Sequence, residues 1–436
     1  MSNEDVCVGL DIGTDKVCAI VGRYNQYQKI EILGHSTAKI KGVKQGEINN
    51  PLQASEAISR VIREVASIAN VEHITYIYTN SSGKNLSCHT TEHTITCNNT
   101  DQLITEADVS KMIDEVKKFP IKDGLVVIDV IPQEFIVDSE SVVSPVGMWA
   151  THMIGKFLVI TTKKQVINNL MKAIQIASPN TQIAGIIPSI VASMEAVLTE
   201  DQREMGTVVM DIGGGVTDIG FVKNGIIKHI GVFPWGGHII DKDLSENLEI
   251  VMEVSKKCKE RFGSAVVYSD LEDSIINLPE YMGRGERKIS LANLATVIGA
   301  RVEEYLEIIH YLLNVPHFFK GMNGILLVGG SSNLNNIVPL TNFKLQRRTE
   351  KGSPSICLAT ENKYTKEVSQ AQFSTAIGLL IRGIKDIEKY KLEEKATQKV
   401  EPKSKKWNPF SSILVRITGQ STKNNEEDNP NDDFDR

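Results

Sequence analysis

The hydrophobic and polar positions of the first 80 residues alternate between short apolar runs and the wider spacing of an amphipathic helix. Apolar runs predict strands over 6–12, 17–23 and 29–33, which would form an opening β-meander. Apolar residues at helical spacing predict a helix over 52–69, and a strand follows at 74–79. This order of elements indicates a unit of the α/β class.

The pattern changes over residues 84–162, which have the size of a small α+β subdomain. A helix is predicted over 105–118, where Thr105 and Asp108 resemble a capping box with Asp in place of the usual Glu or Gln. Strands are predicted over 125–131, 133–138 and 153–161. We therefore expect a separate insert here.

The α/β alternation returns at residue 163. The spacing predicts helices over 164–177, 188–199, 240–262, 291–313 and 371–390, and strands over 182–186, 207–212, 217–223, 226–232 and 324–330. Residues 6–22 and 207–232 share one pattern, in which an apolar strand runs into Asp-Ile-Gly and a second strand follows. Such a repeat indicates an internal duplication.

Composition narrows the possible classes of protein. The 436 residues carry 48 Lys and Arg against 54 Asp and Glu, and the net charge of −6 argues against a protein that coats nucleic acid. No apolar run reaches the length of a membrane-spanning helix, and the N-terminus lacks the features of a signal peptide. The six cysteines form no CxxC pair, which favours reduced thiols in a cytoplasmic protein.

Three glycine turns follow apolar strands, at 11–14, 211–215 and 329–332. Backbone N–H groups of such turns converge on anions, so a phosphate is the expected ligand. Asp11 and Asp211 would repel a phosphate unless a cation intervenes, which implies Mg²⁺ held through water. The residues expected at the phosphates are Gly13, Thr14, Lys16, Gly213, Gly214, Gly215, Thr217, Gly329, Gly330 and Ser331.

In this order, the turns resemble those of the actin, heat-shock-chaperone and sugar-kinase ATPases. Segment 11–16 is similar to the first phosphate loop of that superfamily, 211–217 to the second and 329–332 to the adenosine loop. The resemblance implies a two-lobed, actin-like ATPase fold made of duplicated ribonuclease-H-like domains, with ATP and Mg²⁺ as cofactors. It also implies that Lys259 contacts the nucleotide.

The same resemblance assigns a water-positioning role to one helix. Segment 187–195 looks like the connecting helix of the superfamily, and Glu195 falls where actin has glutamine. Glu195 would polarise the attacking water, with Asp218 near the same water. The alternative is that Glu195 is a solvated carboxylate on a helix surface.

Further motifs resemble one family within the superfamily, the actin-like cell-division proteins of the FtsA family. These motifs are 10–17, IPQEF at 131–135, PVGM at 145–148 and WGG at 235–237 with Asp243. The resemblance covers about residues 5–390, and the insert at 84–162 is similar to the FtsA subdomain. Three positions depart from the family pattern: Lys256 stands where Glu is usual, Ser331 where a third glycine is usual, and 80–84 strays from a glycine-rich turn.

This resemblance implies a protein that polymerises and ties the FtsZ ring to the cytoplasmic face of the cell membrane at the division site. It implies that the insert recruits later division proteins, and that the C-terminal peptide of FtsZ binds the small subdomain at 238–322. Arg301 looks like a family position for that contact, since a basic groove suits an acidic peptide. The alternative is an Arg paired with Glu304 or Glu307 on its own helix.

The pattern of the C-terminal segment predicts a lipid anchor. A charged linker at 391–406 precedes an apolar island at 407–418, and 419–436 is expected to be a disordered acidic tail. At helical spacing the island places its apolar side chains on one face, namely Trp407, Phe410, Ile413, Leu414 and Ile417. Binding to anionic membrane lipid is the favoured interpretation, and docking on the protein's own core is the alternative.

The expected division of the chain follows from these patterns. The first-lobe core comprises 1–83, 163–206 and a closing helical segment at 358–390, and the second-lobe core comprises 207–237 and 323–357. A sugar or small-acid kinase of the same superfamily is the alternative function, because the phosphate loops are common to both classes. A relative that assembles pili or serves ethanolamine use is disfavoured by the IPQEF and PVGM motifs.

Overall fold

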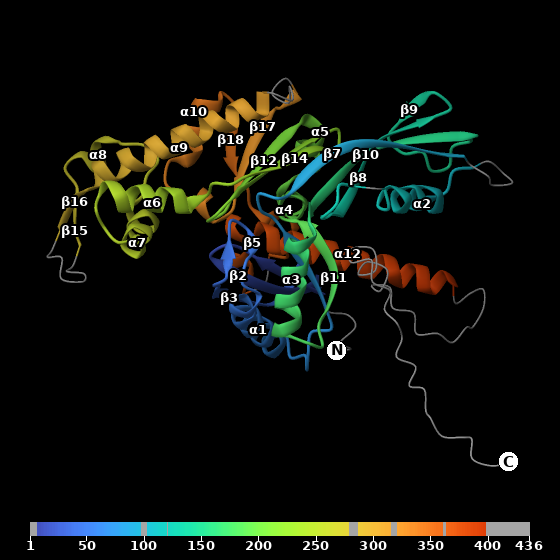
Figure 1. Ribbon diagram of the computed structural model, residues 1–436, viewed down its shortest axis with the longest axis horizontal. Coiled ribbons are helices and arrows are strands. Elements are labelled where there is room, and N and C mark those ends of the chain that lie inside the picture. Colours follow the sequence, from blue (N-terminus) through green and yellow to red (C-terminus); the bar gives the residue numbers. More distant parts are fainter. Residues whose placement is uncertain are drawn as a thin grey trace, which may run out of the picture.

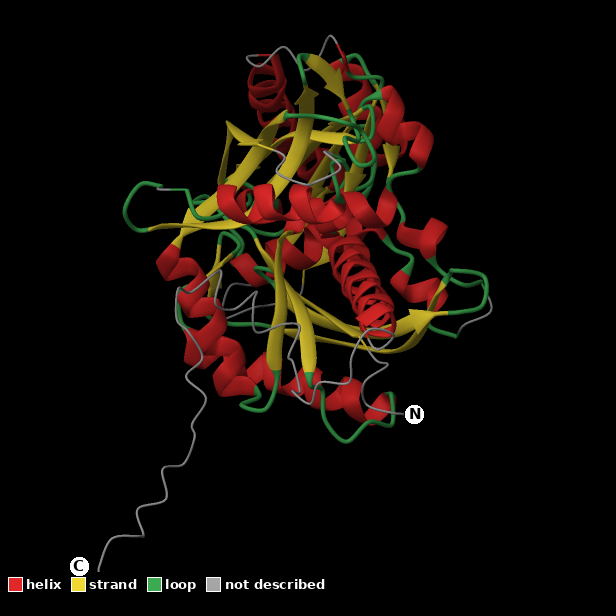
Figure 2. Cartoon of the chain, turned by 90° about the vertical axis from the view of Figure 1, so that its right-hand side faces the viewer, coloured by secondary structure: helices red, strands yellow, loops and turns green. Residues whose placement is uncertain are grey.

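The computed structural model describes residues 7–96, 103–119, 121–278, 287–314, 321–360 and 363–397. Two five-stranded sheets form the centres of two lobes, and a four-stranded sheet forms the insert beside them (Figure 1). Helices flank the strands, as the view in Figure 2 shows. The membrane-anchor residues predicted at 407–418 lie outside the described residues.

The first sheet has the order β11-β6-β1-β2-β3. Its strands are β1 (Cys7–Ile12), β2 (Lys16–Tyr24), β3 (Ile30–Lys39), β6 (Tyr76–Ser81) and β11 (Gln182–Pro188). The first three strands are antiparallel, as the meander predicts, and β6 and β11 are parallel to β1. Helix α1 (Pro51–Ile68) packs on β2 and β3. Helix α3 (Lys164–Ala177) packs on α1 and on the short strand β5 (Glu47–Ile48), which pairs with β4 (Val43–Lys44).

The second sheet repeats this topology, with the order β14-β13-β12-β17-β18. Its strands are β12 (Thr207–Ile212), β13 (Thr217–Lys223), β14 (Ile226–Phe233), β17 (Gly324–Val328) and β18 (Arg348–Lys351). The first hairpin of each sheet closes with the same hydrogen bond, from Gly13 N to Lys16 O at 2.9 Å and from Gly213 N to Val216 O at 3.0 Å. The predicted internal duplication is therefore confirmed.

The insert has its own sheet, in the order β7-β10-β8-β9, and one helix. The elements are β7 (Ser87–Thr96), α2 (Glu106–Val116), β8 (Leu125–Val137), β9 (Glu140–Val142) and β10 (His152–Lys163). The capping box of Thr105 and Asp108 is present. The two strands predicted over 125–138 are one strand, because a bulge at Gln133 lets β8 continue past Pro132. Strand β7 was not predicted because most of its side chains are polar.

The outer part of the second lobe is mainly helical. It contains α6 (Gly237–Asn247), α7 (Met252–Phe262), α8 (Ser269–Glu272), β15 (Ile275–Leu278), β16 (Arg287–Ser290) and α9 (Leu291–Asn314). The single helix predicted over 240–262 is wrong. The chain turns between α6 and α7, where Glu249 has a φ of 51°. Helix α10 (Ile337–Leu345), β18 and the short helices α5 (Glu200–Met205) and α11 (Thr365–Val368) had not been predicted.

Two helices join the lobes, α4 (Ser189–Val197) and α12 (Ser374–Thr397). Helix α12 packs on β1, β2 and β6, while α4 packs on α12 and also on β12 and β13 of the second sheet. Gly378 allows the two helices to touch, since a Cβ there would lie 1.8 Å from the carbonyl oxygen of Ala192. One apolar core therefore continues from the first sheet into the second. Within the described ranges, no helix is both long and apolar enough to span a bilayer.

Candidate functional site

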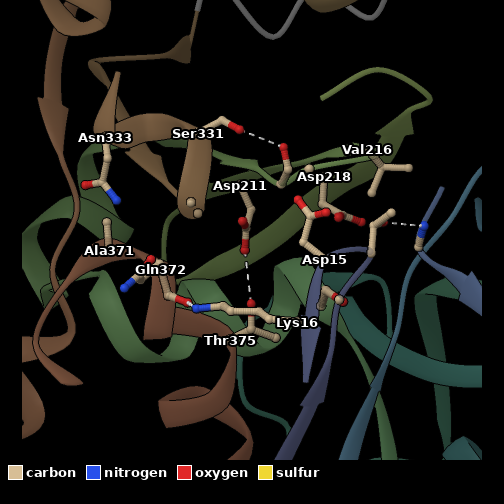
Figure 3. A pocket seen from close by; sticks show the side chains of 18 of the residues that line it. Asp15, Lys16, Asp211, Val216, Asp218, Ser331, Asn333, Ala371, Gln372 and Thr375 are labelled. Carbon is tan, nitrogen blue, oxygen red and sulfur yellow. Dashed lines mark hydrogen bonds between the residues drawn. The ribbon is translucent and has the colours of Figure 1, made fainter. Parts of the chain in front are cut away.

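A cavity of about 410 Å³ lies between the lobes, where the three predicted glycine turns meet (Figure 3). Its lining includes most of the predicted site residues, namely Asp11, Gly13, Thr14, Lys16, Asp211, Gly213, Gly214, Asp218, Lys259, Gly329, Gly330 and Ser331. The β1–β2 turn faces the β12–β13 turn, so the duplication itself brings the two Asp-Ile-Gly segments together.

Glycine is required in these turns where chains approach closely. A Cβ on Gly214 would lie 2.4 Å from Asp15 Oδ2, and a Cβ on Gly215 would lie 2.7 Å from Thr14 Oγ1. Gly329 has a φ of 85°, and a Cβ there would meet Asp211 Oδ1 at 2.4 Å. Gly215 thus packs against the first turn and does not line the cavity.

Three carboxylates are buried at the floor of the cavity, each less than a tenth exposed: Asp11, Asp211 and Asp218. Burial, opposed by Lys16 and reinforced by Asp211, raises the pKa of Asp11 to about 7. Burial and the charges of Asp211 and Asp11 raise the pKa of Asp218 to about 8, against a hydrogen bond from Ser82. Burial also raises the pKa of Asp211. The floor therefore favours protons or a cation.

Side chains of the first lobe hold the carboxylates of both lobes in place. Asn80 donates to Asp11 Oδ1 at 2.9 Å, and Ser82 donates to Asp218 at 2.8 Å. Asp211 Oδ2 accepts from Ser193 at 2.6 Å and from Thr375 at 3.1 Å. The sequence had marked 80–84 only as a departure from a family pattern, and nothing in the local sequence pointed to Thr375.

The donor set fits a hydrated divalent cation. Among the residues that the structure describes, no three His, Cys, Asp or Glu side chains are grouped closely enough to ligate a metal directly. Magnesium retains several of its waters in proteins and needs few carboxylates. Asp11 and Asp211 would hold such an ion through water, because burial raises the pKa of both carboxyl groups and a cation would stabilise their ionised forms.

Lysines and apolar side chains occupy other walls of the cavity. Lys16 Nζ donates to the carbonyl oxygen of Gln372 at 3.1 Å and lies over the ring of Phe373. Lys259 is paired with Asp241 at 2.7 Å and donates to the carbonyl oxygen of Gly237 at 2.8 Å. The lining also includes a mixture of apolar and polar residues, namely Ile240, Lys256, Glu260, Gly263, Asn333, Leu334 and Asn335. This mixture of groups suits a flat, partly polar ring and its sugar.

The remaining site predictions fall elsewhere. Glu195 is not among the residues that line the cavity; on α4 it faces α12 and pairs with Lys385 at 2.5 Å. The predicted role in positioning water is therefore not supported by its place in the fold. Thr217 is buried and donates to the carbonyl oxygen of Trp235 at 3.0 Å, outside the cavity lining.

Arg301, predicted as a partner contact, is engaged within the chain. Its guanidinium binds the carboxylate of Asp243 on α6 and that of Glu304 on α9, and it lies over the ring of Trp235. The pairing with Glu304 agrees with the alternative stated for Arg301 from the sequence, an ion pair on its own helix. Arg301 thus fastens α9 to α6, and its side chain is 22% exposed.

Comparisons of the sequence with known families agree with the motifs. A family model described as "Cell division protein FtsA" matches residues 208–378, and one described as "SHS2 domain inserted in FTSA" matches 83–161. The Cell division protein FtsA of Neisseria meningitidis serogroup B is 31% identical over 376 residues, which are 85% of this chain and 88% of that protein. The FtsA of Escherichia coli K12 is 28% identical, with 88% and 91% of the two chains covered.

Solved structures show the same fold. A chain from the "PilM-PilN type IV pilus biogenesis complex" has a TM-score of 0.63 at 14% identity, and 87% of this chain and 98% of that chain are covered. MreB5 of Spiroplasma citri, in a structure described as bound to ADP, has a TM-score of 0.52 at 14% identity, with 89% and 99% covered. The predicted fold class, a two-lobed actin-like fold with an insert, is confirmed.

Proposed function

Because the chain belongs to the FtsA family of cell division proteins, we propose that it binds ATP with Mg²⁺ between its lobes and assembles into filaments. The observation that carries this proposal is the meeting of three buried carboxylates with two duplicated glycine turns in one cavity. The similarly folded MreB5, described as bound to ADP, supports the choice of ligand.

Different residues of the site would bind different parts of the nucleotide. The backbone N–H groups of the two turns and Lys16 would hold the phosphates, with Lys259 at the cavity wall. Asp11 and Asp211 would hold hydrated Mg²⁺, which neutralises phosphate charge when it is bound. Ile240 and Leu334 would enclose the base, and Ser331 joins the adenosine loop to the second turn through a 2.9 Å hydrogen bond to Gly213 O.

Nucleotide titration with and without Mg²⁺ tests this assignment. Asp211→Ala should abolish Mg²⁺-dependent binding of a fluorescent ATP analogue, because it removes one of the two carboxylates that would hold the cation. Asp201→Ala, an exposed carboxylate on α5, is the matched control and should bind as wild type does. If a folded Asp211→Ala protein binds the analogue with unchanged Mg²⁺-dependent affinity, the assignment of this cavity as the site for ATP and Mg²⁺ is wrong.

Slow hydrolysis is part of the proposal. Glu195 is turned toward Lys385, and Asp218, the other residue expected near the attacking water, lines the cavity and accepts a hydrogen bond from Ser82. Neither is a free base, since Asp218 has a raised pKa and is bonded to Ser82. ATP turnover of about 10 s⁻¹, typical of ordinary enzymes, would favour the sugar-kinase or small-acid-kinase alternative.

Membrane attachment through the C-terminal segment rests on the sequence. Residues 407–418 place Phe410, Ile413, Leu414 and Ile417 on one helical face, next to Lys405 and Lys406. Leu414→Asp should release the protein from anionic liposomes and leave nucleotide binding intact, whereas Ser412→Asp, on another face, should affect attachment less. Wild-type co-sedimentation of Leu414→Asp would point to docking on the protein's own core.

The remaining proposed partners follow from family membership. We propose that the chain tethers the FtsZ ring at the cytoplasmic face of the division site, that the FtsZ C-terminal peptide binds 238–322, and that the insert recruits later division proteins. An acidic peptide would have to compete with Asp243 and Glu304 for Arg301. Fluorescence anisotropy of a labelled FtsZ peptide tests this: Arg301→Ala should weaken binding, and Arg287→Ala, at a more exposed arginine of the same subdomain, is the control.

A further inference from the structure

Asp15 connects the two lobes at the rim of the cavity. It stands in the β1–β2 turn of the first lobe and accepts a 2.7 Å contact from His238 Nε2 on α6 of the second lobe. Lys256 on α7 lies 3.1 Å from the same oxygen, Oδ1. Burial alone would raise the pKa of Asp15, yet the hydrogen bond and charge of His238 and the charge of Lys256 hold it well below its usual range.

This cluster closes directly over the second glycine turn. A Cβ on Gly214 would meet Asp15 Oδ2 at 2.4 Å and His238 Nε2 at 3.2 Å. The backbone N–H of His238 also donates to Gly214 O at 2.8 Å, which attaches His238 to that turn. Asp15 and Lys256 both line the cavity. A ligand bound between the turns therefore has the cluster beside it.

The side chains of Asp15, His238 and Lys256 are more exposed to solvent than those that make the contacts at the floor of the cavity. The side chains of Asp15, Lys256 and His238 are 38%, 35% and 40% exposed. The cross-lobe bond between Ser82 and Asp218 joins residues that are each almost fully buried. Contacts at the floor can thus persist while the exposed contacts open, because ion pairs in water cost little to break.

We propose that Asp15, His238 and Lys256 form a rim latch that holds the two turns together and slows both the binding and the release of nucleotide. The inference rests on the proposed function for its ligand, and the latch itself rests on the contacts above. Lys256 stands where the FtsA resemblance leads one to expect Glu, and a Glu at this position would repel Asp15.

Stopped-flow measurements with a fluorescent ADP analogue test the latch. Lys256→Gln should raise the association and dissociation rate constants together, each about two- to fivefold, as expected for losing a partly exposed ion pair. Lys256→Glu should raise both further, since it places like charges together. Lys257→Gln, which removes the same charge from the exposed side of α7, is the matched control and should change neither.

Two of the three latch residues, Asp15 and Lys256, should act as one unit. The double variant Asp15→Asn/Lys256→Gln should be no faster than the more affected single variant. High salt should accelerate release from wild type and have little effect on Lys256→Gln. The latch would be refuted if the rate changes of the two single variants add fully in the double variant. It would also be refuted if Lys256→Gln releases nucleotide at the wild-type rate. A slower or unchanged association rate with faster release would instead make Lys256 a direct ligand of the phosphates.

Hydrogen exchange measured without nucleotide tests the latch independently of the proposed ligand. Lys256→Gln should raise amide exchange in segments 13–16 and 237–240 together, while Lys257→Gln should leave both unchanged. If the wild-type protein binds no nucleotide, the proposed function is wrong, and the hydrogen-exchange measurement alone then tests whether the latch exists. Equal exchange in Lys256→Gln and wild type would then refute it.

Discussion

Raising the pH should destabilise the chain through its buried carboxylates when no divalent cation is present. Asp11 has a usual pKa of 3.8 and about 7 in the folded state. The folded state therefore binds a proton more tightly than the unfolded state does, and stability falls as the pH rises from about 4 to about 7. Asp11→Asn keeps the shape and the acceptor for Asn80 while removing the charge.

The expected size follows from the pKa of Asp11. Between about pH 5 and its pKa of about 7 lie roughly two pH units, which amount to about 3 kcal/mol of unfolding free energy. Asp218, with a pKa of about 8, adds to the loss in wild type and remains in the variant. Half-buried His229 has a pKa lowered by desolvation and acts in the opposite direction as the pH rises, also in both proteins. The difference between the two proteins therefore reports Asp11 together with its coupling to Asp218, whose pKa the charge of Asp11 helps to raise.

Urea unfolding followed by tryptophan fluorescence provides the measurement. Asp11→Asn should gain about 3 kcal/mol relative to wild type between about pH 5 and about pH 8. Magnesium should restore stability to wild type at the higher pH, because a cation stabilises the ionised carboxylates, and should have a smaller effect on Asp11→Asn. A difference between the two proteins that is independent of pH would show that the pKa of Asp11 is not raised in the folded state.

Further predictions concern the contacts around the site. Ser193→Ala should weaken Mg²⁺-dependent nucleotide binding by about tenfold in titrations, since Asp211 loses its 2.6 Å donor; unchanged affinity would contradict this. Gly329→Ala should cost about 1–3 kcal/mol of unfolding free energy because of its positive φ, whereas Gly330→Ala, with open space around it, should cost little. Gly378→Ala should lower stability by about 3 kcal/mol, since its Cβ would overlap a carbonyl oxygen of α4; a wild-type urea midpoint would contradict the close packing of α4 on α12.

Much of the fold was predictable because its signals are local. Apolar runs that end in Asp-Ile-Gly mark both hairpins, and helical spacing marks α1, α3 and α9. The errors occur where a neighbouring element decides the outcome. Polar β7 is a strand because β10 supplies its backbone partners, and β8 passes Pro132 because a bulge absorbs one residue.

The sequence alone determined the two glycine turns and their aspartates, because a strand, a tight turn and a second strand depend on neighbouring residues. Only the tertiary structure decided which distant side chains complete the site. Successive residues on a helix are about 100° apart, so Ser193 on α4 faces Asp211 while Glu195, two residues on, faces Lys385. The direction of α4 between the two sheets is set by its packing on α12, a contact between segments almost 200 residues apart that no local pattern encodes.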